Sequence, residues 1–131
     1  MHETPADPPL RAARTARPAR HYDEVVAWYR DLVGLPVIGE FGGGEFDGTI
    51  FGLPDERFQL ELLRHRSGEP APQPTEEDLL VLYLADETGR AAIEERLEAA
   101  GEEPVPLANG YWAGIGAVGY RDPDGWILVI A

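Results

Sequence analysis

The clearest hydrophobic pattern in the chain begins at Tyr22. Apolar residues recur from there at the i, i+3, i+4, i+7 spacing that places side chains on one face of a helix. Asp23 and Glu24 suit the start of a helix, where the macrodipole favours negative charge. Gly34 suits its end, because the residue after a helix often adopts a left-handed conformation. We therefore expect a helix over residues 22–33.

Strand-like segments lie on both sides of this helix. Residues 10–17 fit an extended strand that stops at Pro18, and three more strands are expected over residues 35–41, 46–53 and 58–64. Residues 66–78 then have three prolines and four acidic residues, which is the composition of a linker. The first nine residues, MHETPADPP, have three prolines and no apolar periodicity, so we expect a disordered tail.

The second half of the chain repeats this order. An apolar strand over residues 79–84 precedes a helix over about 88–100, which Asp86 or Thr88 can cap and Gly101 can end. A weak strand near 103–106, a loop with the sequence ANGYW, and strands near 114–121 and 126–131 follow, with the turn DPDG between the last two. Two βαβββ modules, at residues 10–65 and 79–131, indicate an internal duplication.

Composition restricts the chemistry more than the fold. The 131 residues fit one domain, or two small modules that share a core. Without Cys or Lys the chain has no thiolate ligand, disulfide, Cys nucleophile or Lys Schiff base, and its one serine, Ser67, lies in the linker. A net charge of −13 disfavours nucleic acid and anionic membranes. Since no apolar run approaches the roughly 18 residues of a membrane span and no signal peptide is visible, we expect a cytoplasmic protein.

Several stretches, in this order, resemble the vicinal oxygen chelate superfamily of glyoxalases, bleomycin-resistance proteins and extradiol dioxygenases. WYRDLVGL at residues 28–35 resembles the end of its first helix, and FQLELLRH at 58–65 resembles a strand that carries one metal ligand. YRDPDGWILVI at 120–130 resembles its closing hairpin. The resemblance covers residues 10–131 and implies an α+β fold, in which two βαβββ modules form curved mixed sheets around a central cup.

The resemblance also identifies the positions that would hold a metal ion. In metal-using members each module supplies two ligands, and the corresponding residues here are Arg14, Glu61, Leu80 and Val129. A divalent ion needs about three N, O or S ligands. Arginine keeps its proton, and leucine and valine have no donor atom. We therefore expect no metal and no cofactor, and an ion pair between Arg14 and Glu61 in the place of the metal. This pair either only joins two strands or also binds a polar group of a ligand.

Aromatic residues form a second candidate site. Tyr111 and Trp112 lie on the ANGYW segment, and loops on a rigid scaffold often carry binding residues. Trp112 is the best candidate for stacking on a ligand. In full, the predicted ligand-binding residues are Arg14, Phe46, Phe51, Glu61, Leu80, Tyr83, Tyr111, Trp112 and Val129.

Arginines are concentrated near the N-terminus, where four of them fall within ten residues: Arg11, Arg14, Arg17 and Arg20. They form either a solvated face or a group in which at least one guanidinium lies inside a pocket.

Three functions remain open. The resemblance to bleomycin-resistance proteins implies a metal-independent protein that sequesters an aromatic or polyketide-like small molecule, in a groove shared by the subunits of a homodimer. Antibiotic resistance, including self-resistance, would be its role. The alternative is a metal-independent isomerase or lyase, with Glu61 as general base and Arg14 stabilising an oxyanion. A purely structural or regulatory domain is the third.

Overall fold

A computed structural model describes residues 10–68 and 73–131, so the tail expected at residues 1–9 lies outside the described residues. The helices and strands of the described residues are, in chain order, β1 (Ala13–Pro18), α1 (Tyr22–Ala27), η1 (Trp28–Val33), β2 (Val37–Phe41), β3 (Phe46–Gly52), β4 (Phe58–His65), β5 (Leu79–Leu82), α2 (Glu87–Ala99), α3 (Tyr111–Gly114), β6 (Val118–Arg121) and β7 (Ile127–Ile130).

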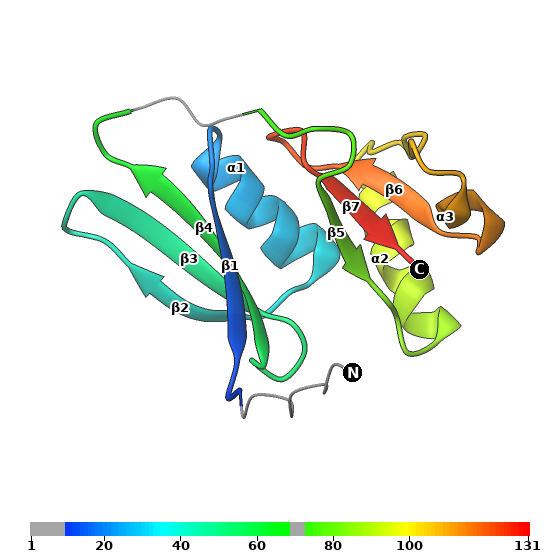
Figure 1. The fold of residues 1–131 in the computed structure, drawn as a ribbon, viewed down its shortest axis with the longest axis horizontal. Coiled ribbons are helices and arrows are strands. Elements are labelled where there is room, and N and C mark those ends of the chain that lie inside the picture. Colours follow the sequence, from blue (N-terminus) through cyan, green and yellow to red (C-terminus); the bar gives the residue numbers. More distant parts are fainter. Residues whose placement is uncertain (1–9, 69–72) are drawn as a thin grey trace, which may run out of the picture.

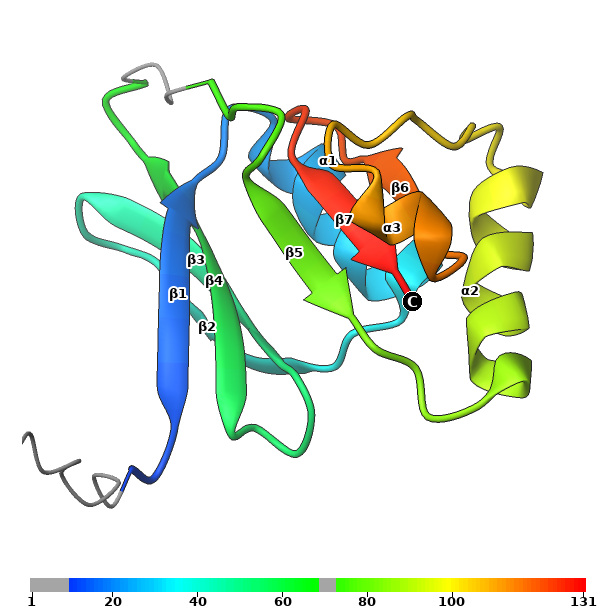
Figure 2. The same ribbon diagram turned by 45° about the vertical axis from the view of Figure 1, so that its right-hand side comes forward.

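The strands form two open mixed sheets. The first has the order β1-β4-β3-β2, with β1 parallel to β4 and the other pairs antiparallel. The second has the order β5-β7-β6, with β5 parallel to β7. The strand expected near residues 103–106 is reduced to one bridge between Val105 and Gly119. The expected α+β arrangement with mixed sheets is therefore confirmed. Figures 1 and 2 show the sheets beside each other, with β5 on the side of the second sheet that is nearer the first.

The helix expected over residues 22–33 is present, but its second half has a different backbone. α1 continues directly into η1, a π-helix, in which the hydrogen bonds span five residues. Gly34 ends it in the left-handed conformation, with φ of 85°. The N–H groups of Gly34 and Leu35 both donate to the carbonyl of Tyr29, each at 3.0 Å. The predicted end of the helix is therefore correct.

The second helix also follows the prediction. Asp86 caps α2 by accepting a hydrogen bond from the N–H of Gly89 at 2.8 Å. Gly101, just after the helix, has φ of 84°. Arg96 near the C-terminus of α2 donates from Nε to the carbonyl of Leu32 at 2.8 Å, so α2 is tied to the end of η1. None of the helices in residues 10–68 and 73–131 is long and apolar enough to cross a membrane.

The main core lies between the sheets and the helices α1, η1 and α2. Leu60 and Leu62 of β4 point to this side, which we call the helix face, and so do Leu128 and Ile130 of β7. All four are at most 1% exposed, in one cluster with Tyr29. A buried side chain of this size contributes roughly 1.5–3 kcal/mol to stability, so this shared core fixes the two sheets relative to each other.

The opposite side of both sheets, which we call the front face, differs between the two halves. Strand alternation turns Glu61 of β4 and Val129 of β7 to this face. In the second sheet, Val129 is fully buried in a cluster against which Leu107 and Trp112 pack. Trp112, in the last part of the ANGYW segment, lies in the short helix α3 next to β7, whereas residues 108–110 form the expected loop (Figure 2). In the first sheet the front face is open, and Phe46 there is 42% exposed.

Candidate functional site

Arg14 and Glu61 form the ion pair that the sequence predicts. Nη1 of Arg14 donates to Oε1 of Glu61 at 2.9 Å. Nε of the same guanidinium donates to the amide oxygen of Gln59 at 2.8 Å. Glu61 is only 8% exposed in the interior strand β4, whereas the side chain of Arg14, in the edge strand β1, is 46% exposed. A buried carboxylate therefore meets a more accessible cation on the front face of the first sheet.

The surface around this pair is mainly apolar. Ile50 of β3 lies opposite Glu61 in the strand register, and Phe46 lies further along the same face. The ring of Phe41 packs on Gly48, where a Cβ atom would overlap the ring. Phe41 and Phe46 are both more than 40% exposed. Exposed aromatic rings on the same face of the sheet as a hydrogen-bonded ion pair suit a flat ligand that carries a polar group.

Glu61 retains capacity for a further hydrogen bond. A carboxylate has about four acceptor positions on its two oxygens. Oε1 is bonded to Arg14, and Oε2 forms no hydrogen bond with any residue that the structure describes. A ligand hydroxyl could therefore donate to Glu61 while a ligand carbonyl accepts from Arg14.

The strand register corrects one of the four predicted metal positions. In the first sheet, Arg14 pairs with the residue two places before Glu61. In the second sheet, Leu79 pairs with the residue two places before Val129. Leu79 is therefore the counterpart of Arg14, and the expected position, Leu80, is one residue out of register. Leu80 packs on the helix face instead.

The donor set does not fit a divalent ion. Leu79 and Val129 have no donor atom, Arg14 keeps its proton, and Glu61 supplies one carboxylate. Within the two described stretches of the chain, no three His, Cys, Asp or Glu side chains gather closely enough to hold a metal ion.

Phe51 does not belong to the front-face site. It is fully buried on the helix face, where its ring lies 6.2 Å from the ring of Tyr29. The neighbouring residue, Ile50, occupies the front-face position instead. The expectation that Phe51 contacts a ligand on the cup side is therefore wrong, because the strand turns the side chain the other way.

The remaining predicted aromatics lie away from the ion pair. Tyr83 follows β5 and is 69% exposed. Tyr111 is 58% exposed, and its ring lies 5.1 Å from that of Trp112 in an edge-to-face arrangement. Trp112 covers the front face of the second sheet and is not a free platform at a rim. A ligand-binding role for Tyr83, Tyr111 and Trp112 stays a prediction.

The sequence analysis missed a buried polar network on the helix face. Nη2 of Arg17 donates to the hydroxyl of Tyr29 at 2.9 Å, and that hydroxyl donates to Oδ2 of Asp122 at 2.7 Å. Burial raises the pKa of Tyr29 well above its ordinary value and also raises the pKa of Asp122. The sequence did indicate that Arg17 lies on the helix face. Residues three apart in a strand, such as Arg14 and Arg17, point to opposite faces.

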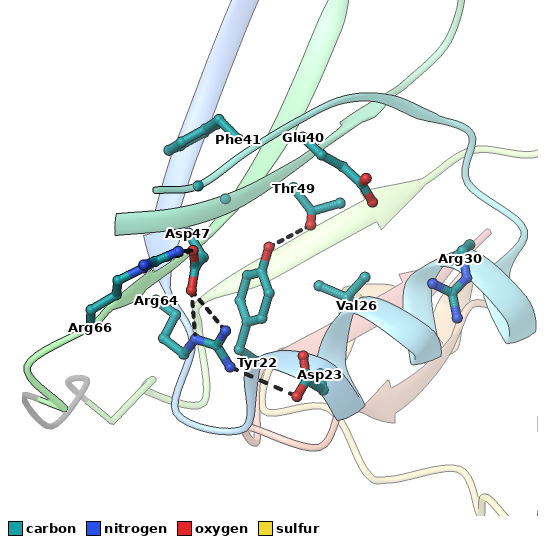
Figure 3. A pocket seen from close by; sticks show the side chains of 12 residues that line it. Tyr22, Asp23, Val26, Arg30, Glu40, Phe41, Asp47, Thr49, Arg64 and Arg66 are labelled. Atoms are coloured by element: carbon teal, nitrogen blue, oxygen red, sulfur yellow. Dashed lines mark hydrogen bonds and ion pairs between the residues drawn. The ribbon is translucent and has the colours of Figure 1, made fainter. Parts of the chain in front are cut away.

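A polar concavity of about 730 Å³ lies between α1 and the hairpin of β2 and β3 (Figure 3). Several of its polar side chains are paired with one another. The hydroxyls of Tyr22 and Thr49 lie 2.6 Å apart, and Asp47 accepts hydrogen bonds from Arg64 and Arg66 at 2.7 Å each. The Arg64 guanidinium also lies over the Tyr22 ring, 4.8 Å from its centroid. These contacts stabilise the hairpin against α1, so we interpret the concavity as structural.

The two sheets and the front-face ion pair define a glyoxalase-like protein of the vicinal oxygen chelate superfamily. Residues 13–63 match the YycE-like N-terminal domain and residues 77–131 match the YycE-like C-terminal domain. The chain therefore belongs to the YycE-like family.

The relatives of the chain include proteins of known structure. The YycE protein of Bacillus subtilis (strain 168) is 38% identical over 117 residues, which cover 88% of this chain and 84% of that protein. The crystal structure of a YycE protein of unknown function from Bacillus subtilis, whose name suggests a glyoxalase/fosfomycin resistance protein, has a TM-score of 0.83 at 37% identity, over 92% of this chain and 88% of that one. A glyoxylase/bleomycin resistance protein/dioxygenase domain from Frankia sp. EAN1pec has a TM-score of 0.65 at 18% identity and covers 97% of both chains, which supports the fold alone.

Proposed function

We propose that this protein is a metal-independent binding protein that sequesters an aromatic or polyketide-like compound on the front face of its first sheet. The observation that carries the proposal is the ion pair between Arg14 and Glu61, set in an open apolar surface where metal-using relatives hold an ion. Antibiotic resistance in the cytoplasm, including self-resistance, is the role that we infer for such sequestration.

The chemistry of the pair limits the ligand. Glu61 accepts hydrogen bonds and Arg14 donates them, so the pair matches a compound with a hydroxyl close to a carbonyl. Hydroxyquinones and many polyketides have this arrangement on a flat ring system. Phe41 and Phe46 supply aromatic surface for those rings, and each is more than 40% exposed.

We also propose that a second copy of the chain closes this site. An open apolar face on a soluble monomer favours association, because contiguous exposed apolar patches are uncommon on monomers. A homodimer would bury Phe41 and Phe46 together with the ligand. Sedimentation with and without ligand measures the oligomeric state.

Calorimetric titration with matched ligands tests the binding site. We expect 1,8-dihydroxyanthraquinone to bind and anthraquinone, which lacks the hydroxyls, to bind at least tenfold more weakly, the size expected for losing a hydrogen bond to a charged group. Glu61→Gln and Arg14→Gln should each weaken binding by a similar factor. Arg30→Gln is the matched control, because Arg30 is exposed on the helix side and paired with Asp31. Equal affinity of the two quinones, or of all three variants, would contradict the proposal.

The alternative is a metal-independent isomerase or lyase. The observation that favours it is the free Oε2 of the buried Glu61, which could take a proton next to a carbonyl while Arg14 stabilises the resulting oxyanion. Mass spectrometry of the bound compound separates the two functions. Intact recovery after long incubation supports sequestration, and conversion that is lost in Glu61→Gln supports the enzyme.

A further inference from the structure

Arg17 is a buried cation that forms no ion pair with a carboxylate of the described residues. It is 9% exposed in an edge strand. Its Nη2 donates to the hydroxyl of Tyr29, but its Nε is fully buried and has no hydrogen-bond partner in the described part of the chain. Burial of a charged group is costly unless the group is paired and hydrogen-bonded, so an oxygen acceptor is missing here.

The aromatic neighbours of Arg17 compensate only part of this cost. Its guanidinium carbon lies 4.6 Å from the ring centroid of Trp126 and 5.5 Å from that of Tyr29. A ring face attracts a cation but does not accept the N–H bond in the guanidinium plane. Asp122 is connected to Arg17 by hydrogen bonds only through the Tyr29 hydroxyl, although its charge also acts on the cation.

The guanidinium lines a cavity of about 420 Å³ between the edge strands β1 and β5. Phe58 and Leu80 line this cavity and also a neighbouring one of about 710 Å³, which extends towards Leu53 and Leu84 and has mostly apolar walls. The two cavities are therefore adjacent, with a cation in the wall of one and apolar side chains along the other. Pockets of this size hold small organic molecules.

Asp78, the acidic residue that also lines the cavity of Arg17, is already hydrogen-bonded to Thr75. Oδ2 of Asp78 accepts hydrogen bonds from the N–H of Thr75 at 2.6 Å and from its hydroxyl at 2.8 Å. These bonds lower the pKa of Asp78, so it remains an anion that is held by Thr75. It does not supply the acceptor that Arg17 lacks.

We propose that the cavity between β1 and β5 binds a small carboxylic acid with an apolar body, whose carboxylate is held by the Arg17 guanidinium and whose body lies along Phe58 and Leu80. The Arg17 side chain is on the opposite face of β1 from Arg14, so the proposal does not depend on the front-face function. A carboxylate in the cavity supplies the guanidinium with a hydrogen-bond acceptor that is itself negatively charged.

Titration with decanoate, its neutral analogue decanol, and acetate tests the site. Decanoate should bind at least tenfold more tightly than decanol, because a hydrogen bond to a charged group contributes about that much. Acetate should not bind measurably, because it lacks the apolar body. In ¹H–¹⁵N spectra, the Arg17 Nε–H resonance, identified by its loss in Arg17→Gln, should shift with decanoate.

Three variants complete the test. Arg17→Gln should abolish the preference for decanoate over decanol. If this variant does not fold, Thr15→Phe provides the test. Thr15 is exposed and lines the same cavity, so a larger side chain there should block binding in a folded protein. Arg30→Gln removes the same charge from an exposed position, where Arg30 is paired with Asp31, and should leave decanoate binding unchanged. Equal binding of decanoate and decanol, unchanged binding in Thr15→Phe, or equal losses in Arg30→Gln and Arg17→Gln would overturn the proposal.

Discussion

Asp124 accepts two hydrogen bonds from His21, one from its backbone N–H at 2.8 Å and one from its ring Nδ1 at 2.9 Å. Its other oxygen accepts from the backbone N–H of Arg20 at 2.8 Å. Asp124 lies in the DPDG turn of the second half, and His21 immediately precedes α1 of the first half. The turn therefore holds the two residues that precede a helix about a hundred residues away in sequence.

Removal of this contact should destabilise the fold. We expect Asp124→Ala to lower the free energy of unfolding by about 1–2 kcal/mol, because it leaves backbone N–H groups at a helix entry without their acceptor. Urea unfolding measures the loss, and hydrogen exchange should accelerate in the first turn of α1. Asp86→Ala, which removes the local cap of α2, is the matched control and should accelerate exchange only in α2. Identical exchange patterns in the two variants would contradict this role of Asp124.

Removal of the Tyr29 hydroxyl should destabilise the fold. Tyr29→Phe removes the acceptor of Arg17 and the donor to Asp122, which leaves two buried charged groups less satisfied. We expect a loss of about 2–4 kcal/mol in the free energy of unfolding. Tyr120→Phe is the control, since the Tyr120 hydroxyl forms no hydrogen bond within the described stretches. A similar small loss in both variants would show that the network contributes little.

Asp122 should make the protein less stable as the pH rises. Burial raises its pKa above the ordinary value of 3.8, although hydrogen bonds from Tyr29 and two backbone N–H groups act in the opposite direction. Between the ordinary and the raised value, the folded state binds more protons at this site than the unfolded state. The contribution of Asp122 to the free energy of unfolding therefore falls as the pH rises through that window.

The comparison of wild type with Asp122→Asn isolates this effect, because the other acidic residues are common to both proteins. Urea unfolding from about pH 3 to pH 7 should show the free energy of the wild type falling relative to that of the variant. A relative free energy that rises with pH, or stays flat, would be evidence against a raised pKa.

Purified protein that has been dialysed should hold no stoichiometric divalent metal. Arg14, Leu79 and Val129 cannot act as ligands, and one carboxylate is too few for tight binding. Elemental analysis by mass spectrometry measures the metal content, and thermal unfolding with and without added Zn²⁺ or Mn²⁺ provides a second readout. One equivalent retained through dialysis, or a clear rise in Tm with metal, would contradict the expectation.

The first helix could be predicted from the sequence, because the spacing of its apolar residues defines it. The helix that begins at Tyr22 was predicted from the spacing of its apolar residues, and its end at Gly34 from the freedom of glycine at positive φ. Both features are present. The π-type hydrogen bonds of η1 were not predicted, because the same apolar spacing is compatible with bonds that span four or five residues. The pairing of Arg14 with Glu61 was predicted correctly from the superfamily positions.

The errors concern the direction of side chains in strands that are apolar on both faces. Leu79 and Leu80 are identical residues in a continuously apolar strand, so no alternation shows which one points to the front face. Ile50 and Phe51 present the same ambiguity in β3. The covering position of Trp112 depends on contacts with the second sheet across the chain, and local sequence carries no signal for those contacts.

The burial of Val129 beneath Trp112 determines what a substitution at position 129 could achieve. A glutamate placed at 129 would enter a dry, filled interior, not a cup that could admit an ion, so no single substitution there could restore a ligand position. In the second half, Trp112 covers the front face of the sheet, whereas in the first half the front face is exposed to solvent. The two halves of the chain therefore present different front faces: that of the first sheet exposes Phe41 and Phe46, and that of the second sheet is covered by Trp112.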